Sequence, residues 1–176
     1  MALAKVARRA PPKAARGQKQ PVDLGAALVR AFLTNERINQ VLLELVDPAI
    51  WRESPPSSKR RNIATTFAHM HNVRCMRLKM AANEIPVPAR LDRAEVTQAE
   101  ARQALTKSAE TMTRLIEQSL ETGSTDVAAL VGAAINHEAH HRGQICHWAR
   151  ELGAPITPEQ QLRMWEWSKR AKEVRR

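Results

Sequence analysis

Apolar residues recur along most of the chain at the three- and four-residue spacing of an amphipathic helix. Four such runs cover about residues 23–46, 58–83, 97–123 and 126–153, and a shorter run begins at Thr157. Alternation of apolar and polar residues, which is typical of a strand, is hard to find anywhere. The pattern therefore predicts an all-α fold, a four-helix bundle followed by an extra C-terminal helix.

Short capping signals support these boundaries. Asp23 can cap the first helix, and the run Thr97-Gln98-Ala99-Glu100 has the form of a capping box for the third. Gly153 suits the position just past the fourth helix, where a left-handed backbone is common. Thr157, followed by a proline and then a glutamine at the third helical position, should start a helix that runs to the C-terminus.

A long connector separates the second and third helices. It covers residues 84–96 and contains two prolines. A short loop would make these helices antiparallel neighbours, whereas this length permits a crossover along the bundle. We therefore expect three parts: a disordered basic tail at 1–20, a bundle with a long crossover at 21–155, and a C-terminal helix at 156–176.

The net charge of +10 belongs to the two ends of the chain. Residues 1–20 carry six basic residues and no acid, residues 161–176 carry six basic and two acidic residues, and the remainder is balanced. Such ends could contact nucleic acid weakly, or could simply be solvated. The two cysteines make no disulfide framework, and no apolar run has membrane-spanning length, so we expect a cytoplasmic protein without membrane contact.

Four of the six histidines lie in the run HEAHHRGQICH at residues 137–147. Residues four apart on a helix differ by about 40° in direction and about 6 Å in height, so His137 and His141 can reach one ion. Both lie in the arc that this helix should bury, and a buried imidazole needs a hydrogen bond, a shifted pKa or a metal. We therefore predict a divalent metal site here, completed by a ligand from another helix.

The best third ligand is His69 on the second helix. It shares a face with Thr66, Val73, Met76 and Met80. His71 points about 160° away from His69, off that face. On the first helix, Asn35 and Asn39 interrupt the apolar stripe. They could lie behind the metal ligands, or could bond each other or a neighbouring backbone.

The same run matches the HExxH motif of zinc proteases, in which the glutamate is a general base. His147 stands where the longer form of that motif has its third ligand, but Gln144 replaces the glycine that turns the chain out of the helix. In a continuous helix, His147 would lie about 9 Å along the axis from His141 and about 120° around it. A protease is therefore the weaker alternative.

These residues give the chain a resemblance to the DinB/YfiT-like superfamily. The carriers are AHMHNVR at 68–74 and HEAHHRGQI at 137–145, and the resemblance covers about residues 23–155. It implies a four-helix bundle with a long connection between the second and third helices. It also implies a three-histidine site for zinc or nickel, which carries over onto His69, His137 and His141. Relatives include S-transferases and isomerases that use low-molecular-weight thiols.

The residues and the resemblance together indicate a metal-dependent hydrolase or a thiol-dependent transferase that acts on a small-molecule substrate. Glu138 could act as a base or orient a histidine, and Gln144 could bond a ligand or the substrate. Arg74 and Arg142 could bind an anionic substrate, or could be solvated. A metal-binding or stress-response protein without turnover is the alternative.

Two tryptophans near the C-terminus bear on the oligomeric state. Trp165 and Trp167 lie two residues apart on the expected last helix and so point in different directions. Covering both rings takes the bundle and a second chain. We therefore predict a homodimer.

Overall fold

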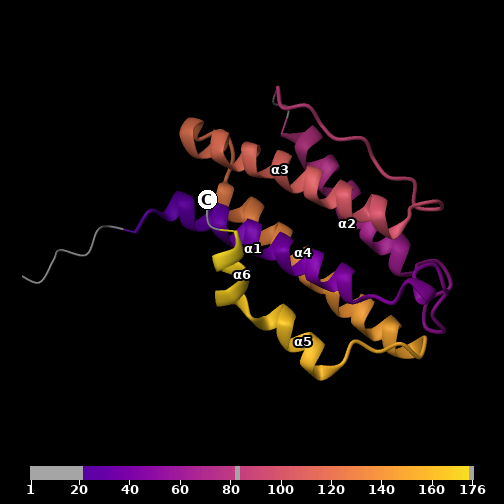
Figure 1. Ribbon diagram of the computed structural model, residues 1–176. Coiled ribbons are helices and arrows are strands. Elements are labelled where there is room, and N and C mark those ends of the chain that lie inside the picture. The colour runs from indigo at the N-terminus through magenta and orange to yellow at the C-terminus, as the bar shows by residue number, and fades with distance from the viewer. Residues whose placement is uncertain (1–21, 82–83, 175–176) are drawn as a thin grey trace, which may run out of the picture.

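The computed structural model describes residues 22–81 and 84–174, and within these ranges the protein is helical and contains no strand. The all-α prediction is confirmed. Four long helices pack side by side (Figure 1): α1 (Leu24–Leu45), α2 (Ile63–Met80), α3 (Gln98–Thr122) and α4 (Val127–Glu151). A single 3₁₀ turn, η1 (Pro48–Ile50), precedes α2, and two short helices, α5 (Pro158–Trp165) and α6 (Trp167–Glu173), follow α4. The tail expected at residues 1–20 lies outside the described residues.

α1 and α2 each pack against both α3 and α4. α2 and α3 run in the same direction. Trp51, ahead of α2, donates to the carbonyl of Val96, ahead of α3, and Arg74 in mid-α2 donates to the carbonyl of Leu105 in α3. Because parallel neighbours cannot be joined by a tight turn, the chain between them must return along the helices.

The connector between α2 and α3 runs back along α2. The side chain of Asn72 accepts from the backbone N–H of Leu91 and donates to its carbonyl, at 2.9 and 3.0 Å. Nε2 of His71 lies 2.9 Å from the carbonyl of Ala89. His71 is therefore buried, contrary to the helical-wheel prediction, because the connector covers the side of α2 that faces away from His69.

Capping residues fix most helix ends where the sequence predicted them. Asp23 accepts from the N–H of Ala26, and Thr97 forms its capping box. Gly153 follows α4 with a φ of 79°. The start of α2 was predicted too early, at 58 instead of 63. Asn62 caps this helix through its own capping box, which leaves the residues before it in the loop.

The C-terminal helix is not continuous as predicted. At Glu166 the backbone leaves the helical conformation (ψ 57°), which separates α5 from α6. The change of direction turns α6 against α1, where Arg170 is buried and bonds Glu166 and Glu173. Glu173 also accepts from Arg37 of α1 at 2.7 Å. α5 and α6 thus cover the outer side of α1 (Figure 1).

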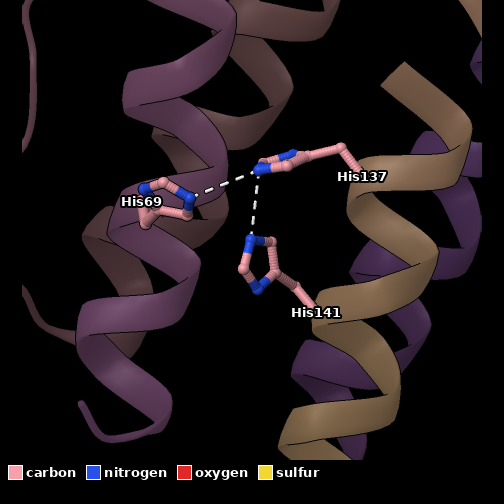
Figure 2. Close-up of side chains that lie close together, drawn as sticks. All are labelled: His69, His137 and His141. Carbon is pink, nitrogen blue, oxygen red and sulfur yellow. Dashed lines mark hydrogen bonds between the residues drawn. The ribbon is translucent and has the colours of Figure 1, made fainter. Parts of the chain in front are cut away.

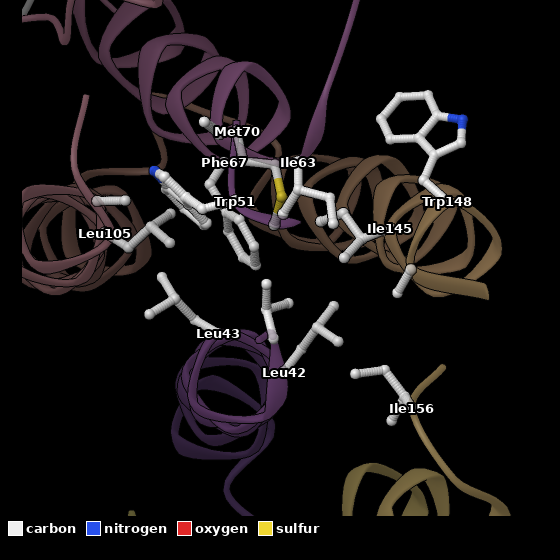
Figure 3. Close-up of a cluster of buried hydrophobic side chains, with 14 of the residues drawn as sticks. Leu42, Leu43, Trp51, Ile63, Phe67, Met70, Leu105, Ile145, Trp148 and Ile156 are labelled. Atoms are coloured by element: carbon white, nitrogen blue, oxygen red, sulfur yellow. The ribbon is translucent and has the colours of Figure 1, made fainter. Parts of the chain in front are cut away.

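The core is mainly aliphatic, with a few aromatic rings at its centre (Figure 3). Trp51, in the loop between α1 and α2, is buried in this core and stacks on Phe67 with 5.5 Å between ring centroids. Met76 and Met80, which the sequence placed on one face with His69, are exposed. Met80 is the last residue of α2, and Met76 shares the partly open side of this helix with His69.

Within the described residues, no helix is both long enough and apolar enough to cross a membrane.

Candidate metal centre

Three imidazoles converge between α2 and α4 (Figure 2). Nε2 of His137 lies 3.2 Å from Nε2 of His69 and 3.1 Å from Nε2 of His141. The candidate ligand atoms of all three rings lie within 4.8 Å of one another. The structure therefore brings together the three histidines that the sequence selected, from two helices that are antiparallel at this point.

The spacing of the three nitrogens fits a single ion. Ligand atoms at about 2.0–2.1 Å from a tetrahedral metal lie roughly 3.3 Å apart, close to the two observed separations. Hydrogen bonding alone does not satisfy the cluster, since each neutral ring nitrogen is either a donor or an acceptor. Nε2 of His137 faces two other nitrogens, and a single proton on it can serve only one of them. A cation bound by the three Nε2 atoms would satisfy all of them at once.

The electrostatic surroundings keep the rings neutral. Burial, followed by the proximity of His141 and Arg93, lowers the pKa of His69 from its ordinary 6.5 to about 4. Burial also lowers the pKa of His137 and of His141. At neutral pH each of the three rings is therefore neutral and has a lone pair on one of its two nitrogens, as coordination requires.

Two residues hold the outer nitrogens of the ligand rings. Oε1 of Gln144 lies 2.8 Å from Nδ1 of His141, so it accepts a hydrogen bond from the N–H of that nitrogen and leaves Nε2 free to face the cluster. Nη2 of Arg93, from the connector, lies 2.7 Å from Nδ1 of His69. The sequence pointed to Gln144 by its place on the wheel, whereas the connector carries no periodic signal that could have indicated Arg93.

Glu138, next to His137 in the chain, points into a different part of the molecule. Its carboxylate is bound by both Nε and Nη2 of Arg74, at 2.7 and 2.8 Å. The amides of Asn35 and Asn39 each donate to its Oε2 at 2.6 Å. Burial acts to raise the pKa of Glu138, but attraction to Arg74 and these hydrogen bonds outweigh it and lower the pKa. The carboxylate is thus ionised and fully engaged away from the histidines.

The two arginines that the sequence offered as anion-binding groups belong to this same network. Arg74 is buried and also pairs with Glu36 at 2.6 Å. Arg142 donates through Nη1 to the carbonyl oxygens of Asn35 and Asn39. Arg74 is therefore neither solvated nor free to bind an anion, and Arg142 is engaged with the asparagines through Nη1 instead of being simply solvated. The asparagines link the charges of α1, α2 and α4, and their place within an apolar stripe was the one sequence signal for this network.

The remaining histidines of the run lie outside the cluster. α4 continues unbroken through Gly143 and Gln144, so His147 is carried away from His141 and lies 3.5 Å from Glu151 on the surface. This arrangement removes the third ligand of the longer protease motif. The engagement of Glu138 with Arg74 also takes away the base that such a protease requires.

The fold and the site define a helical protein whose candidate metal centre is made of three histidines. The model of the DinB family matches residues 20–173, and the chain therefore belongs to the DinB family. No match was found among curated proteins or among solved structures.

Proposed function

We propose that this DinB family protein is a divalent-metal-dependent enzyme in which His69, His137 and His141 hold zinc or nickel. The convergence of the three Nε2 atoms carries the proposal. Membership of the family supports it, because the three-histidine site that the family implies falls on these residues. We include in the proposal the four-helix bundle with a long crossover, formed by α1 to α4.

The chemistry follows from the character of the ligands. When bound, a divalent ion with open coordination positions acts as a Lewis acid and makes a water or a thiol more acidic. Three neutral imidazoles add no negative charge that would weaken this effect. His69 and His137 are only half-buried, so a small molecule can approach the cluster. Hydrolysis of a small-molecule substrate and transfer of a low-molecular-weight thiol are the two reaction classes that we propose.

Glu138 and Gln144 act in this proposal as positioning residues. Glu138 ties α4 to α1 and α2 directly beside His137, which favours a role in placing the ligand over the role of base. Gln144 fixes the orientation and tautomer of the His141 ring.

Other expectations stay predictions. A homodimer would cover the exposed ring of Trp165 and the partly exposed ring of Trp167. Weak contact of the basic ends with nucleic acid and a cytoplasmic location likewise stay predictions.

Metal analysis tests the proposal directly. Untagged protein should contain close to one zinc or nickel per chain by elemental analysis. The His141→Ala variant should contain almost none and should keep its helical circular dichroism, because a single ring is lost and α4 is held elsewhere. His147→Ala is the matched control on the same helix and should keep its metal. Full metal content in His141→Ala would contradict the proposal, whereas stoichiometric metal without turnover would leave a metal-binding protein.

A further inference from the structure

We propose that the substrate of this site carries an oxyanion, a carboxylate or a phosphate group, and that Arg93 of the connector binds it. This inference rests on the proposed metal site, because it concerns the choice of substrate there.

The outer nitrogens of His141 and His69 have opposite partners. Nδ1 of His141 faces the carbonyl oxygen of the Gln144 side chain, which can only accept, so this nitrogen carries the proton. Nδ1 of His69 faces a guanidinium nitrogen of Arg93 at 2.7 Å. A guanidinium can only donate, so this nitrogen must present a lone pair. The proton of the neutral His69 ring then lies on Nε2, the atom that faces the cluster.

This state of His69 is incompatible with coordination through Nε2. A neutral imidazole that gives the Nε2 lone pair to a cation carries its proton on Nδ1. With a proton there, His69 cannot accept from Arg93. Arg93 and a metal ion therefore compete for His69, and occupation of the site releases the guanidinium at the rim of the cluster.

The released guanidinium would stand in a positively charged region. Arg61 lies close enough to His69 and His141 for its charge to lower the pKa of both rings. The side chains of Arg61 and Arg93 are exposed, and neither is ion-paired with a carboxylate within 22–81 and 84–174. Arg77 is the third cation near the cluster, but its guanidinium is used by backbone carbonyls of α4.

Among the described residues, no ion pair joins a carboxylate to any of the three rings. The charge of Glu138 acts on His137 and His141, but its two oxygens are already bound to Arg74 and the asparagines. A planar guanidinium fork pairs with two oxygens of a carboxylate or phosphate, and these interactions are stronger than neutral hydrogen bonds. An oxyanion is thus the group that this rim selects.

The competition has a measurable consequence. An oxyanion that binds Arg93 draws it away from His69 and so favours the tautomer that coordinates a cation. By linkage, oxyanion and metal must strengthen each other's binding by the same factor. Without Arg93, metal binding should become tighter and should lose its response to the oxyanion.

The experiment measures the zinc dissociation constant of the full chain by competition with a chromophoric chelator. Sulfate serves as the probe oxyanion, and chloride at equal ionic strength serves as the reference. In wild type, sulfate should tighten zinc binding severalfold. In chloride, Arg93→Met should bind zinc roughly tenfold more tightly than wild type, the equivalent of one hydrogen bond to a charged group, and sulfate should change little. Arg114→Met, at an exposed position of α3, should behave as wild type.

The outcomes separate this inference from the metal proposal. Wild type that binds no zinc overturns the proposed function itself. Zinc binding with no sulfate effect in wild type, or with an equal effect in Arg93→Met, overturns the role of Arg93 alone. Weaker zinc binding in a helical Arg93→Met protein would also overturn it, because Arg93 would then support His69 instead of competing for it.

Discussion

Two adjacent residues of α4, His137 and Glu138, belong to clusters that differ in almost every physical respect. Glu138 lies in a closed network of two arginines, two glutamates and two asparagines, in which its carboxylate has four donors within 2.8 Å. His137 faces two other imidazoles in a half-buried space, and its Nε2 cannot satisfy both of them.

The Glu138 network holds the helices together, whereas the histidine cluster remains able to bind a cation. A buried carboxylate whose two oxygens are both bound, as in Glu138, has little left to offer a ligand, and its pairs cost much to break. The histidine cluster has no proton arrangement that satisfies both contacts of His137 Nε2 and therefore suits an added cation. The same helix presents both, because successive side chains differ by about 100° in direction.

Among the changes that test this difference between the two clusters, removal of the Glu138 carboxylate should have the largest effect, a loss of folding stability. Glu138→Ala leaves Arg74 buried with one carboxylate partner fewer, and a broken buried pair costs about 3–5 kcal/mol. Urea unfolding of the metal-free protein would measure the loss. Glu44→Ala is the control, since Glu44 forms more exposed pairs with Arg37 and Arg102 and should cost at most about 1 kcal/mol. If the two variants lost similar stability, the Glu138 network would not be the element that holds α4.

A smaller effect is expected at the histidine cluster itself. Gln144→Ala removes the acceptor that orients His141, and loss of such a partner weakens metal binding by about 10–100-fold. Competition with a chelator would measure this change. Gln144→Glu retains an acceptor at the same position and should bind metal much as wild type does. An unchanged affinity in Gln144→Ala would mean that the His141 ring is held by its packing.

The smallest expected effect concerns pH. The folded chain holds the pKa of His69 at about 4, below its ordinary value of 6.5. The unfolded chain therefore binds more protons between these values, so the contribution of His69 to stability is complete above pH 6.5 and is lost as pH falls toward 4. Urea unfolding of metal-free protein across this range should show the decline, with a shallower slope in His69→Gln. A profile independent of pH would place the His69 ring in a more solvated setting.

Local sequence patterns predicted the structural features that depend only on residues close together in the sequence. Helix caps are set by residues three or four positions apart, which is why Asp23 and Thr97 could be identified. The pairing of His137 with His141 follows from one turn of helix, and His69 could be selected because it shares an apolar face. These rules hold whatever the rest of the chain does.

The missed features depend on segments far apart in the sequence. Glu138 pairs with Arg74, which lies 64 residues away in the sequence, and no periodic pattern predicts a pairing of that kind. His71 is buried only because the connector returns along α2, and Arg93 reaches His69 from that same connector. The break at Glu166 likewise serves contacts of α6 with α1 that lie more than a hundred residues away in sequence.

The way in which Asn72 holds Leu91 has a consequence for how this protein can vary. A single amide side chain on α2 replaces both hydrogen bonds that a neighbouring strand would supply to the backbone of Leu91. The chain after this point is registered to the helix and not to the residues that precede it. Insertions or deletions upstream of residue 89 can therefore alter the length of the connector while the guanidinium of Arg93, two residues past Leu91, keeps its position beside the rings.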